Sequence, residues 1–169
     1  MGMILLSGGT IIFSPKFLLF INLYYFCSVN ENMNDMENKK ELVVLWLDNH
    51  RDPEVWLAKK LASATHRRTL AFLNEKVYPH YSPRFVWVKN MKEFQDYILM
   101  HDMPGVVCFD HDLQARKGDH EPDGRQVAMW FVEYCKEKSV ALPICWVHSG
   151  NMYGAPQIRQ ILGLTEPED

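Results

Sequence analysis

Short apolar segments recur along the chain from residue 41 onward, and polar segments of varied length separate them. The first of these, from Leu42 to Leu47, is a continuous apolar run with no polar alternation. Such a run is typical of a strand that is buried on both faces of a sheet. We predict four strands, at residues 42–47, 85–88, 106–109 and 142–147.

Helix-start signals lie between these strands. Asp52 followed by Pro53 predicts a helix to about residue 64, because proline fits the first helical turn. Asn90 and Asp123 are predicted to cap two further helices, whereas residues 65–84 give no clear pattern. The predicted helices cover 53–64, 91–100, a segment after Asp123 with apolar positions between Val127 and Cys135, and 156–162.

Strands that alternate with helices predict right-handed βαβ units and a mainly parallel sheet. We therefore predict an α/β protein: a small, flavodoxin-like three-layer sandwich whose four-stranded sheet has the order 2-1-3-4. This domain is expected to span residues 41–164, and residues 165–169 are expected to form a polar tail.

Residues 1–40 are predicted to form a separate N-terminal extension. Met3 to Cys27 is mostly apolar, but its longest uninterrupted piece, 17–27, is shorter than the roughly 20 residues that a membrane-spanning helix needs. Three interpretations stay open: upstream translation with the true start at Met33 or Met36, a membrane-associated anchor, or an additional structured element. We favour the first.

The charge and the cysteine content of the chain argue against several classes of protein. The net charge of -3 is small and both signs are interspersed, so the sequence has no electrostatic footprint for nucleic acid. The four cysteines form no CxxC pair, which argues against a zinc ribbon or a thioredoxin-like site. We expect reduced core thiols, a cytoplasmic location and no membrane association, and we predict no particular oligomeric state.

Polar side chains follow three of the predicted strands at the point where each strand ends. Ligands of open α/β sheets bind beyond the carboxyl ends of the strands. In the order 2-1-3-4, strands 1, 3 and 4 are neighbours, so we expect their polar ends to converge on one crevice. These ends are Asp48, Asn49 and Arg51 after the first strand, Asp110, His111 and Asp112 after the third, and His148, Ser149 and Asn151 after the fourth.

The residue types at these ends predict phosphate chemistry. Clustered carboxylates repel one another unless they share a cation, and their hard oxygens suit Mg²⁺ or Mn²⁺. A bound cation would polarise a phosphoryl oxygen and activate water, and imidazoles transfer protons near neutral pH. We predict Asp48, Asn49, Asp110 and Asp112 as metal ligands, Asp110, His111 and His148 as catalytic residues, and Arg51, Ser149 and Asn151 as the groups that bind the substrate.

Other polar residues receive plainer interpretations. Asp52 and Asp123 are expected to serve only as helix caps. His66, His80, His101 and His120 are expected to be surface residues.

The strand-end motifs resemble a known family, the cyclic-phosphate processing receiver domain, which is found in phages and bacteria and is similar to response-regulator receivers. The resemblance covers about residues 41–162. It rests on Leu45–Pro53, Phe109–Leu113 and Val147–Asn151, with further similarity at Phe85–Asn90 and Trp130–Cys135. It implies a receiver-like fold and a metal-dependent phosphoesterase that processes cyclic-phosphate-containing molecules such as nucleotides, so a small phosphorylated ligand is the expected partner.

The chain departs from the family pattern at two points. The family usually has a second acid after the first strand, where this chain has Asn49, an amide that ligates cations with less charge. The lysine that response regulators carry on a fifth strand has no counterpart, which makes phosphorelay signalling less favoured. The alternatives are a non-catalytic module that binds a phosphorylated or cyclic nucleotide, a receiver phosphorylated on Asp110, and, last, a Toprim-like nuclease, which would have glutamate in place of Asp48.

Overall fold

The computed structural model describes residues 4–5, 11–12, 39–60, 63–113 and 122–165. The chain divides into two compact units, Met1–Lys39 and Lys40–Asp169. In the first unit, strands β1 (Ile4–Leu5) and β2 (Ile11–Ile12) pair in antiparallel fashion. The rest of residues 1–38 lies outside the described residues, so the three interpretations of this segment and its boundary stay predictions. No described helix combines the length and apolar character that crossing a membrane requires.

The second unit is built on one four-stranded sheet. Its strands are β3 (Lys40–Leu47), β4 (Tyr81–Val88), β5 (Val106–Phe109) and β6 (Ile144–Val147), and each neighbouring pair is parallel. The strand order β4-β3-β5-β6 confirms the predicted order 2-1-3-4. In the register, Leu47 lies beside both Val88 and Phe109, and Phe109 lies beside Val147. The four strands therefore end at the same level, which brings the residues that follow them to one edge.

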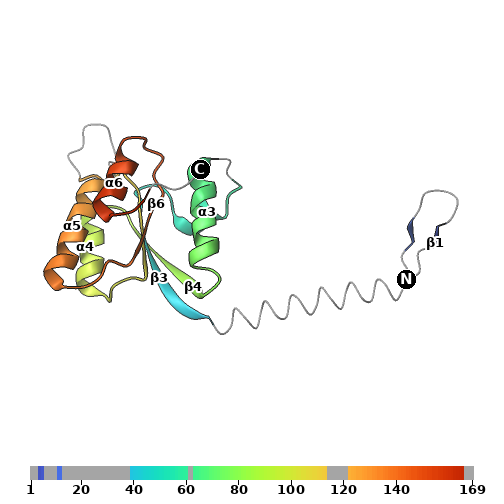
Figure 1. Cartoon of the computed structure of the whole chain (residues 1–169), viewed down its shortest axis with the longest axis horizontal. Coiled ribbons are helices and arrows are strands. Elements are labelled where there is room, and N and C mark those ends of the chain that lie inside the picture. The colour runs from blue at the N-terminus through green and yellow to red at the C-terminus, as the bar shows by residue number, and fades with distance from the viewer. Residues whose placement is uncertain (1–3, 6–10, 13–38, 61–62, 114–121, 166–169) are drawn as a thin grey trace. The chain divides into compact units, whose positions relative to one another are not determined.

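Helices cover both faces of this sheet, as the predicted three-layer sandwich requires. Figure 1 shows α3 on one side of the sheet and α4, α5 and α6 on the other. The helices are α2 (Pro53–Leu57), α3 (Ala64–Lys76), α4 (Met91–Met100), α5 (Gly124–Lys138) and α6 (Gly154–Leu162).

The two faces of the sheet carry separate cores because side chains alternate along a strand. Leu45 and Leu47 of β3 pack in one cluster with Phe94 of α4 and Phe131 of α5. Val44 and Trp46 point to the other face, where the cluster contains Trp56 of α2, Leu73 of α3 and Val77, which caps the end of α3. The last four residues of β3 and all four residues of β5 are buried on both faces of the sheet. This burial explains why these segments are continuously apolar in the sequence.

Several predicted boundaries agree with the structure and others do not. Helix α4 and strand β5 have the predicted limits, and the side chains of Asp52, Asn90 and Asp123 accept hydrogen bonds from the first turns of α2, α4 and α5. Strand β4 begins at Tyr81, before Pro83, within the segment 65–84 that showed no clear sequence pattern. It tolerates this proline because it lies at an edge of the sheet.

The helix predicted over 53–64 starts at the predicted residue, but its predicted end is wrong. Helix α2 ends at Leu57, and a new helix starts after Ser63, whose hydroxyl accepts a hydrogen bond from the backbone N–H of His66. The break turns α3 back onto α2, so His66 is buried and not on the surface as we expected. Its Nε2 lies 3.2 Å from the carbonyl oxygen of Trp56, and its ring packs edge-on against the Trp56 indole. His80 and His101 are exposed, whereas His120 lies outside the described residues.

The described cysteines are core thiols. Cys108, Cys135 and Cys145 are free and buried, as predicted, and Cys27 lies outside the described residues. Burial raises the pKa of the Cys145 thiol to about 12 and raises that of Cys108 as well. These thiols are therefore packing groups and not nucleophiles.

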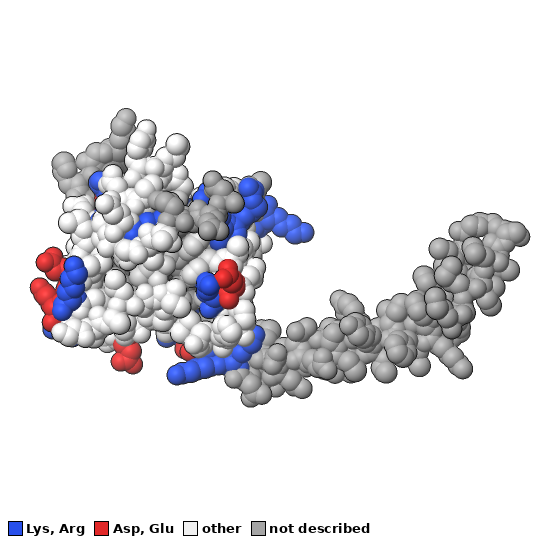
Figure 2. All heavy atoms as spheres, viewed as in Figure 1, with Lys and Arg blue, Asp and Glu red and all other residues white. Residues whose placement is uncertain are grey.

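Charge on the surface is mixed. Figure 2 shows acidic and basic side chains at scattered positions on the face that it displays, with the largest basic area beside α3. Among the described residues on that face, no broad surface of one sign is visible. The view agrees with the small net charge of the sequence.

Candidate active site

The residues that follow β3, β5 and β6 are held in a row by backbone hydrogen bonds. The N–H of Asp48 donates to Val88 O at 3.0 Å, that of Asp110 to Leu47 O at 2.9 Å, and that of His148 to Phe109 O at 2.9 Å. The ladder thus continues one residue beyond each strand. Asp48, Asp110 and His148 meet at the edge of the sheet, as the strand order predicted.

Asp48 is the buried centre of this arrangement. Its Oδ1 accepts hydrogen bonds from the backbone N–H groups of His50 at 2.9 Å and Arg51 at 2.8 Å. Its Oδ2 accepts from Arg51 Nε at 2.5 Å and lies 3.1 Å from His148 Nε2. Burial by itself would raise the pKa of Asp48, but the hydrogen bond from His148 and the charge of Arg51 outweigh burial and hold the pKa below its ordinary value. Asp48 is therefore a carboxylate whose lone pairs are already used.

Arg51 joins the two buried acids. Its Nη2 lies 2.8 Å from Asp110 Oδ1 while its Nε binds Asp48, and Nη1 donates to the carbonyl oxygen of His148 at 3.4 Å. The guanidinium also lies over the Trp56 ring, 5.4 Å from its centroid. Three of its five N–H groups bind described residues, and its side chain keeps 28% of its surface exposed. The other two N–H groups have no partner among the described residues, and Arg51 lines the pocket described below.

His148 lies behind the site and not in it. Its ring is fully buried and stacks on Trp46 with 3.9 Å between centroids. Burial lowers the pKa of His148 although the nearby carboxylates act to raise it, so the ring is neutral and donates from Nε2 to Asp48. Nδ1 has no hydrogen-bond partner among the described residues. In this arrangement His148 supports Asp48 and cannot touch a substrate.

Two tryptophans hold the loop that carries Arg51. The indole N–H of Trp46 donates to the carbonyl oxygen of Arg51 at 3.1 Å, and that of Trp87 donates to the carbonyl oxygen of Asp48 at 2.5 Å. Sequence reasoning assigned both only to strands. A buried indole N–H needs a hydrogen-bond acceptor. This need was the available signal that each tryptophan would bind the backbone of the adjoining loop.

The third strand end forms a second, more exposed network. His111 Nδ1 lies 2.7 Å from Asp112 Oδ1, and Asn151 Nδ2 donates to Asp112 at 3.0 Å. The Asn151 side-chain oxygen accepts from the N–H groups of Tyr153 and Gly154, which fixes the start of α6. The His111 ring packs against Gly154, where a Cβ would lie 1.9 Å from the ring. His111 thus points toward α6 and away from the crevice.

A pocket of about 410 Å³ opens in front of the acids and Arg51. Of the predicted residues, His111 and His148 do not line it, so their predicted catalytic role has no direct geometric support. His50 and Gly150, which sequence reasoning missed, do line it, and His50 has an exposed imidazole. Its position between two predicted site residues was the available signal. The predicted residues that line the pocket are Asp48, Asn49, Arg51, Asp110, Asp112, Ser149 and Asn151.

Donors of the protein already bind the two buried acids of this pocket. Both oxygens of Asp48 are engaged by N–H donors, and Arg51 already neutralises Asp48 and Asp110 together. Among the described residues, no three histidine, cysteine, aspartate or glutamate side chains are grouped so as to hold a cation. A cation at Asp48 would have to displace Arg51. The predicted Mg²⁺ or Mn²⁺ therefore stays a prediction.

Comparison with known proteins identifies the family of the chain. No curated protein and no solved structure matches the chain. A family model described as the cyclic-phosphate processing receiver domain matches residues 43–163. The match covers the whole parallel sheet beyond the first residues of β3, all of its helices and every residue of the site. The chain therefore belongs to the cyclic-phosphate processing receiver domain family.

Proposed function

We propose that the protein is a phosphoesterase that hydrolyses a cyclic phosphate ester, such as that of a cyclic nucleotide, in the pocket beside Arg51. One observation carries this proposal. The Arg51 guanidinium, which two carboxylates hold in place, lines an open pocket, and two of its N–H groups have no partner among the described residues. Arginine binds phosphate through two parallel hydrogen bonds, and a fixed guanidinium loses little freedom in doing so.

The same geometry supports the hydrolytic step. Water attacks phosphorus, one ester P–O bond breaks, and the leaving oxygen takes a proton, which gives a phosphate monoester. Arg51 stabilises the charge that grows on the phosphoryl oxygens. Asp110 Oδ2, the oxygen that does not bind Arg51, is the proposed base for water, and the exposed imidazole of His50 is the proposed proton donor. In this proposal His148 positions Asp48, and Asp48 positions Arg51.

A cation is not used in these steps. A requirement for Mg²⁺ or Mn²⁺ remains a prediction, and the assay decides it by comparing either ion with a chelator. Asp110 has one oxygen, Oδ2, without a partner among the described residues, and Asp112 is the most exposed of the pocket acids. These two are therefore the residues expected to bind the ion.

Hydrolysis of 2′,3′- and 3′,5′-cyclic nucleotides, followed by ³¹P NMR, tests the proposal. The purified protein should convert a cyclic ester to a monoester, and Asp110→Asn should slow conversion by about a hundredfold or more. Asp96→Asn, which removes an exposed carboxylate of α4, should leave the rate unchanged. A folded protein that turns over no member of the panel with or without cations would show that the catalytic proposal is wrong.

One observation favours a second candidate, a module that binds a phosphorylated ligand without turnover. Both histidines predicted as catalytic lie outside the pocket surface. A binding module should retain the cyclic nucleotide unchanged at one molecule per chain. The same ³¹P spectra distinguish the two candidates because the bound ester and the monoester have different chemical shifts.

A further inference from the structure

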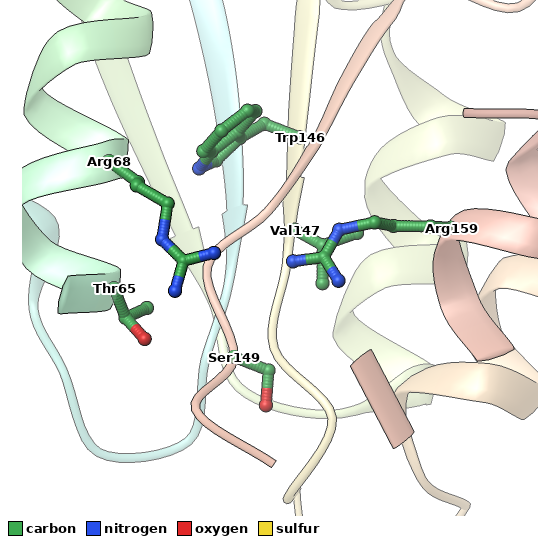
Figure 3. A pocket seen from close by; sticks show the side chains of 6 residues that line it. All are labelled: Thr65, Arg68, Trp146, Val147, Ser149 and Arg159. Atoms are coloured by element: carbon green, nitrogen blue, oxygen red, sulfur yellow. The ribbon is translucent and has the colours of Figure 1, made fainter. Parts of the chain in front are cut away.

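A second, smaller pocket lies beside the end of β6. It has a volume of about 30 Å³. Figure 3 shows Arg68 of α3 and Arg159 of α6 reaching toward the chain after β6 from opposite sides, with Ser149 below and between them. The residues that line this pocket are Thr65, Arg68, Trp146, Val147, Ser149 and Arg159.

The lining of this pocket suits an anion. It contains two guanidinium groups and two hydroxyl groups, and none of the described residues that line it is acidic. Two arginines that reach one small space from separate helices create a positive potential there, and each presents a planar set of donors. A volume of about 30 Å³ suits a single small group such as a phosphate and is too small for a nucleoside.

The wall of the pocket is fixed by packing on α3. The Trp146 ring stacks on Phe72 with 4.6 Å between centroids and 9° between planes. The Trp146 indole N–H donates to Thr69 Oγ1 at 3.0 Å, and the Thr69 hydroxyl donates to the carbonyl oxygen of Thr65 at 2.9 Å. This chain of contacts ties β6 to the helix that carries Arg68. Strand β6 and helix α3 are therefore held to each other on one side of the pocket.

Ser149 connects the two pockets. It lines the small pocket and also the larger pocket that contains Arg51. A group bound in the small pocket and a group bound in the large pocket would therefore lie next to each other, on either side of Ser149. The basic run His66-Arg67-Arg68, which the candidate active site does not use, supplies one of the arginines.

We propose that the small pocket binds a phosphate group, and that the ligand of this protein carries this second phosphate in addition to the ester beside Arg51. The first half of this proposal stands on the small pocket alone. The second half rests on the proposed function. The substrate class is thus a nucleotide-like molecule with a cyclic phosphate and a separate phosphate group.

The first test is a titration with inorganic phosphate, followed by the Trp146 indole signal in ¹H–¹⁵N NMR spectra. Trp146→Phe identifies this signal. The signal should shift to saturation in the wild-type protein. Arg68→Gln and Arg159→Gln should each weaken phosphate binding by at least about tenfold. Arg68→Lys should fall between Arg68→Gln and wild type, because lysine keeps the charge without the planar set of donors.

Arg67→Gln is the matched control, because it removes the same charge from the next position of α3 without touching the pocket. Phosphate that leaves the Trp146 signal in place would overturn the proposal. Arg68→Gln that weakens binding no more than Arg67→Gln would also overturn it. Circular dichroism confirms that each variant is folded.

The second test separates this proposal from the catalytic one. Asp110→Asn alters the large pocket only, so phosphate should bind the small pocket of this variant as in wild type. With wild-type protein, a cyclic nucleotide with an added terminal phosphate should have a KM at least about tenfold lower than the same compound without it. Arg68→Gln should abolish this difference in KM between the two compounds. Equal KM values for both compounds would show that the small pocket does not serve the substrate.

Discussion

The site has a buried half and an exposed half, and the two differ in what they can do. In the buried half, Asp48 and His148 keep 1% and 0% of their side-chain surface, and every oxygen of Asp48 is engaged. In the exposed half, the Asp112 side chain keeps 66% of its surface and its partners are His111 and Asn151. The comparison indicates that the buried half fixes Arg51 in place, whereas contact with ligand falls to the groups that line the pocket.

Removal of Arg51 should have the largest effect, because it leaves two neighbouring carboxylates without their cation. Arg51→Met should lower the free energy of unfolding by about 3 kcal/mol, the lower end for a broken buried ion pair because Arg51 is partly exposed. Urea unfolding measures this change. Mg²⁺ should stabilise the variant more than it stabilises wild type, since the freed carboxylates then have oxygens to offer.

Arg84→Met is the matched control for this experiment. Arg84 pairs with Glu41 at 2.9 Å, but both side chains are more than half exposed. Its removal should leave the free energy of unfolding nearly unchanged. If Arg51→Met and Arg84→Met lowered the free energy of unfolding equally, this result would contradict the division of the site into buried and exposed halves.

The pH dependence of stability should come from the buried half. The pKa of His148 is lower in the folded protein than its value of about 6.5 in the unfolded chain, so the unfolded state binds more protons below that pH. Stability should therefore fall as the pH drops below about 6.5, by at most about 1.4 kcal/mol per pH unit for one group. The lowered pKa of Asp48 adds a further loss at still lower pH, below the unfolded value of about 3.9.

Urea unfolding between pH 7.5 and 5 measures this slope. His148→Gln keeps a donor to Asp48 and removes the titration, so its stability should change less with pH over this range. His101→Gln replaces an exposed histidine and should keep the wild-type slope. A slope that survives in His148→Gln would show that another group controls the titration.

Changes in the exposed half should affect stability least. Asp112→Asn should change the free energy of unfolding by no more than about 0.5 kcal/mol, because its carboxylate is mostly in solvent. It should nevertheless lower kcat/KM for a cyclic nucleotide by about tenfold, since Asp112 lines the pocket. If Asp112→Asn lowered the free energy of unfolding and left kcat/KM unchanged, the roles assigned to the buried and exposed halves would be wrong.

The sequence was sufficient to predict the parallel sheet and to predict that the polar strand ends meet at one edge of it. Val44 to Leu47 are fully buried, so the apolar pattern of this strand was clear. The alternation of strands and helices predicted a parallel sheet, and the strand order followed from the flavodoxin-like fold. The break between α2 and α3 escaped prediction because Ser63 lies within a stretch of good helix formers. That missed break is also why the burial of His66 was not foreseen.

Side-chain direction could not be read from the sequence. His111 and Asp112 are adjacent, yet the first packs on Gly154 and only the second lines the pocket. His148 directly precedes Ser149, but its ring turns inward onto Trp46. Position after a strand predicts that a residue is near the site, whereas the packing of distant helices decides whether it faces the ligand.

The most direct test of the account is a crystal structure of the protein with Mg²⁺ and a non-hydrolysable cyclic nucleotide analogue. We expect the cyclic phosphate to lie in the large pocket within hydrogen-bond distance of Arg51, with the salt bridges from Arg51 to Asp48 and Asp110 intact. A cation seated between Asp48 and Asp110 with Arg51 displaced, or a ligand bound away from Arg51, would contradict it.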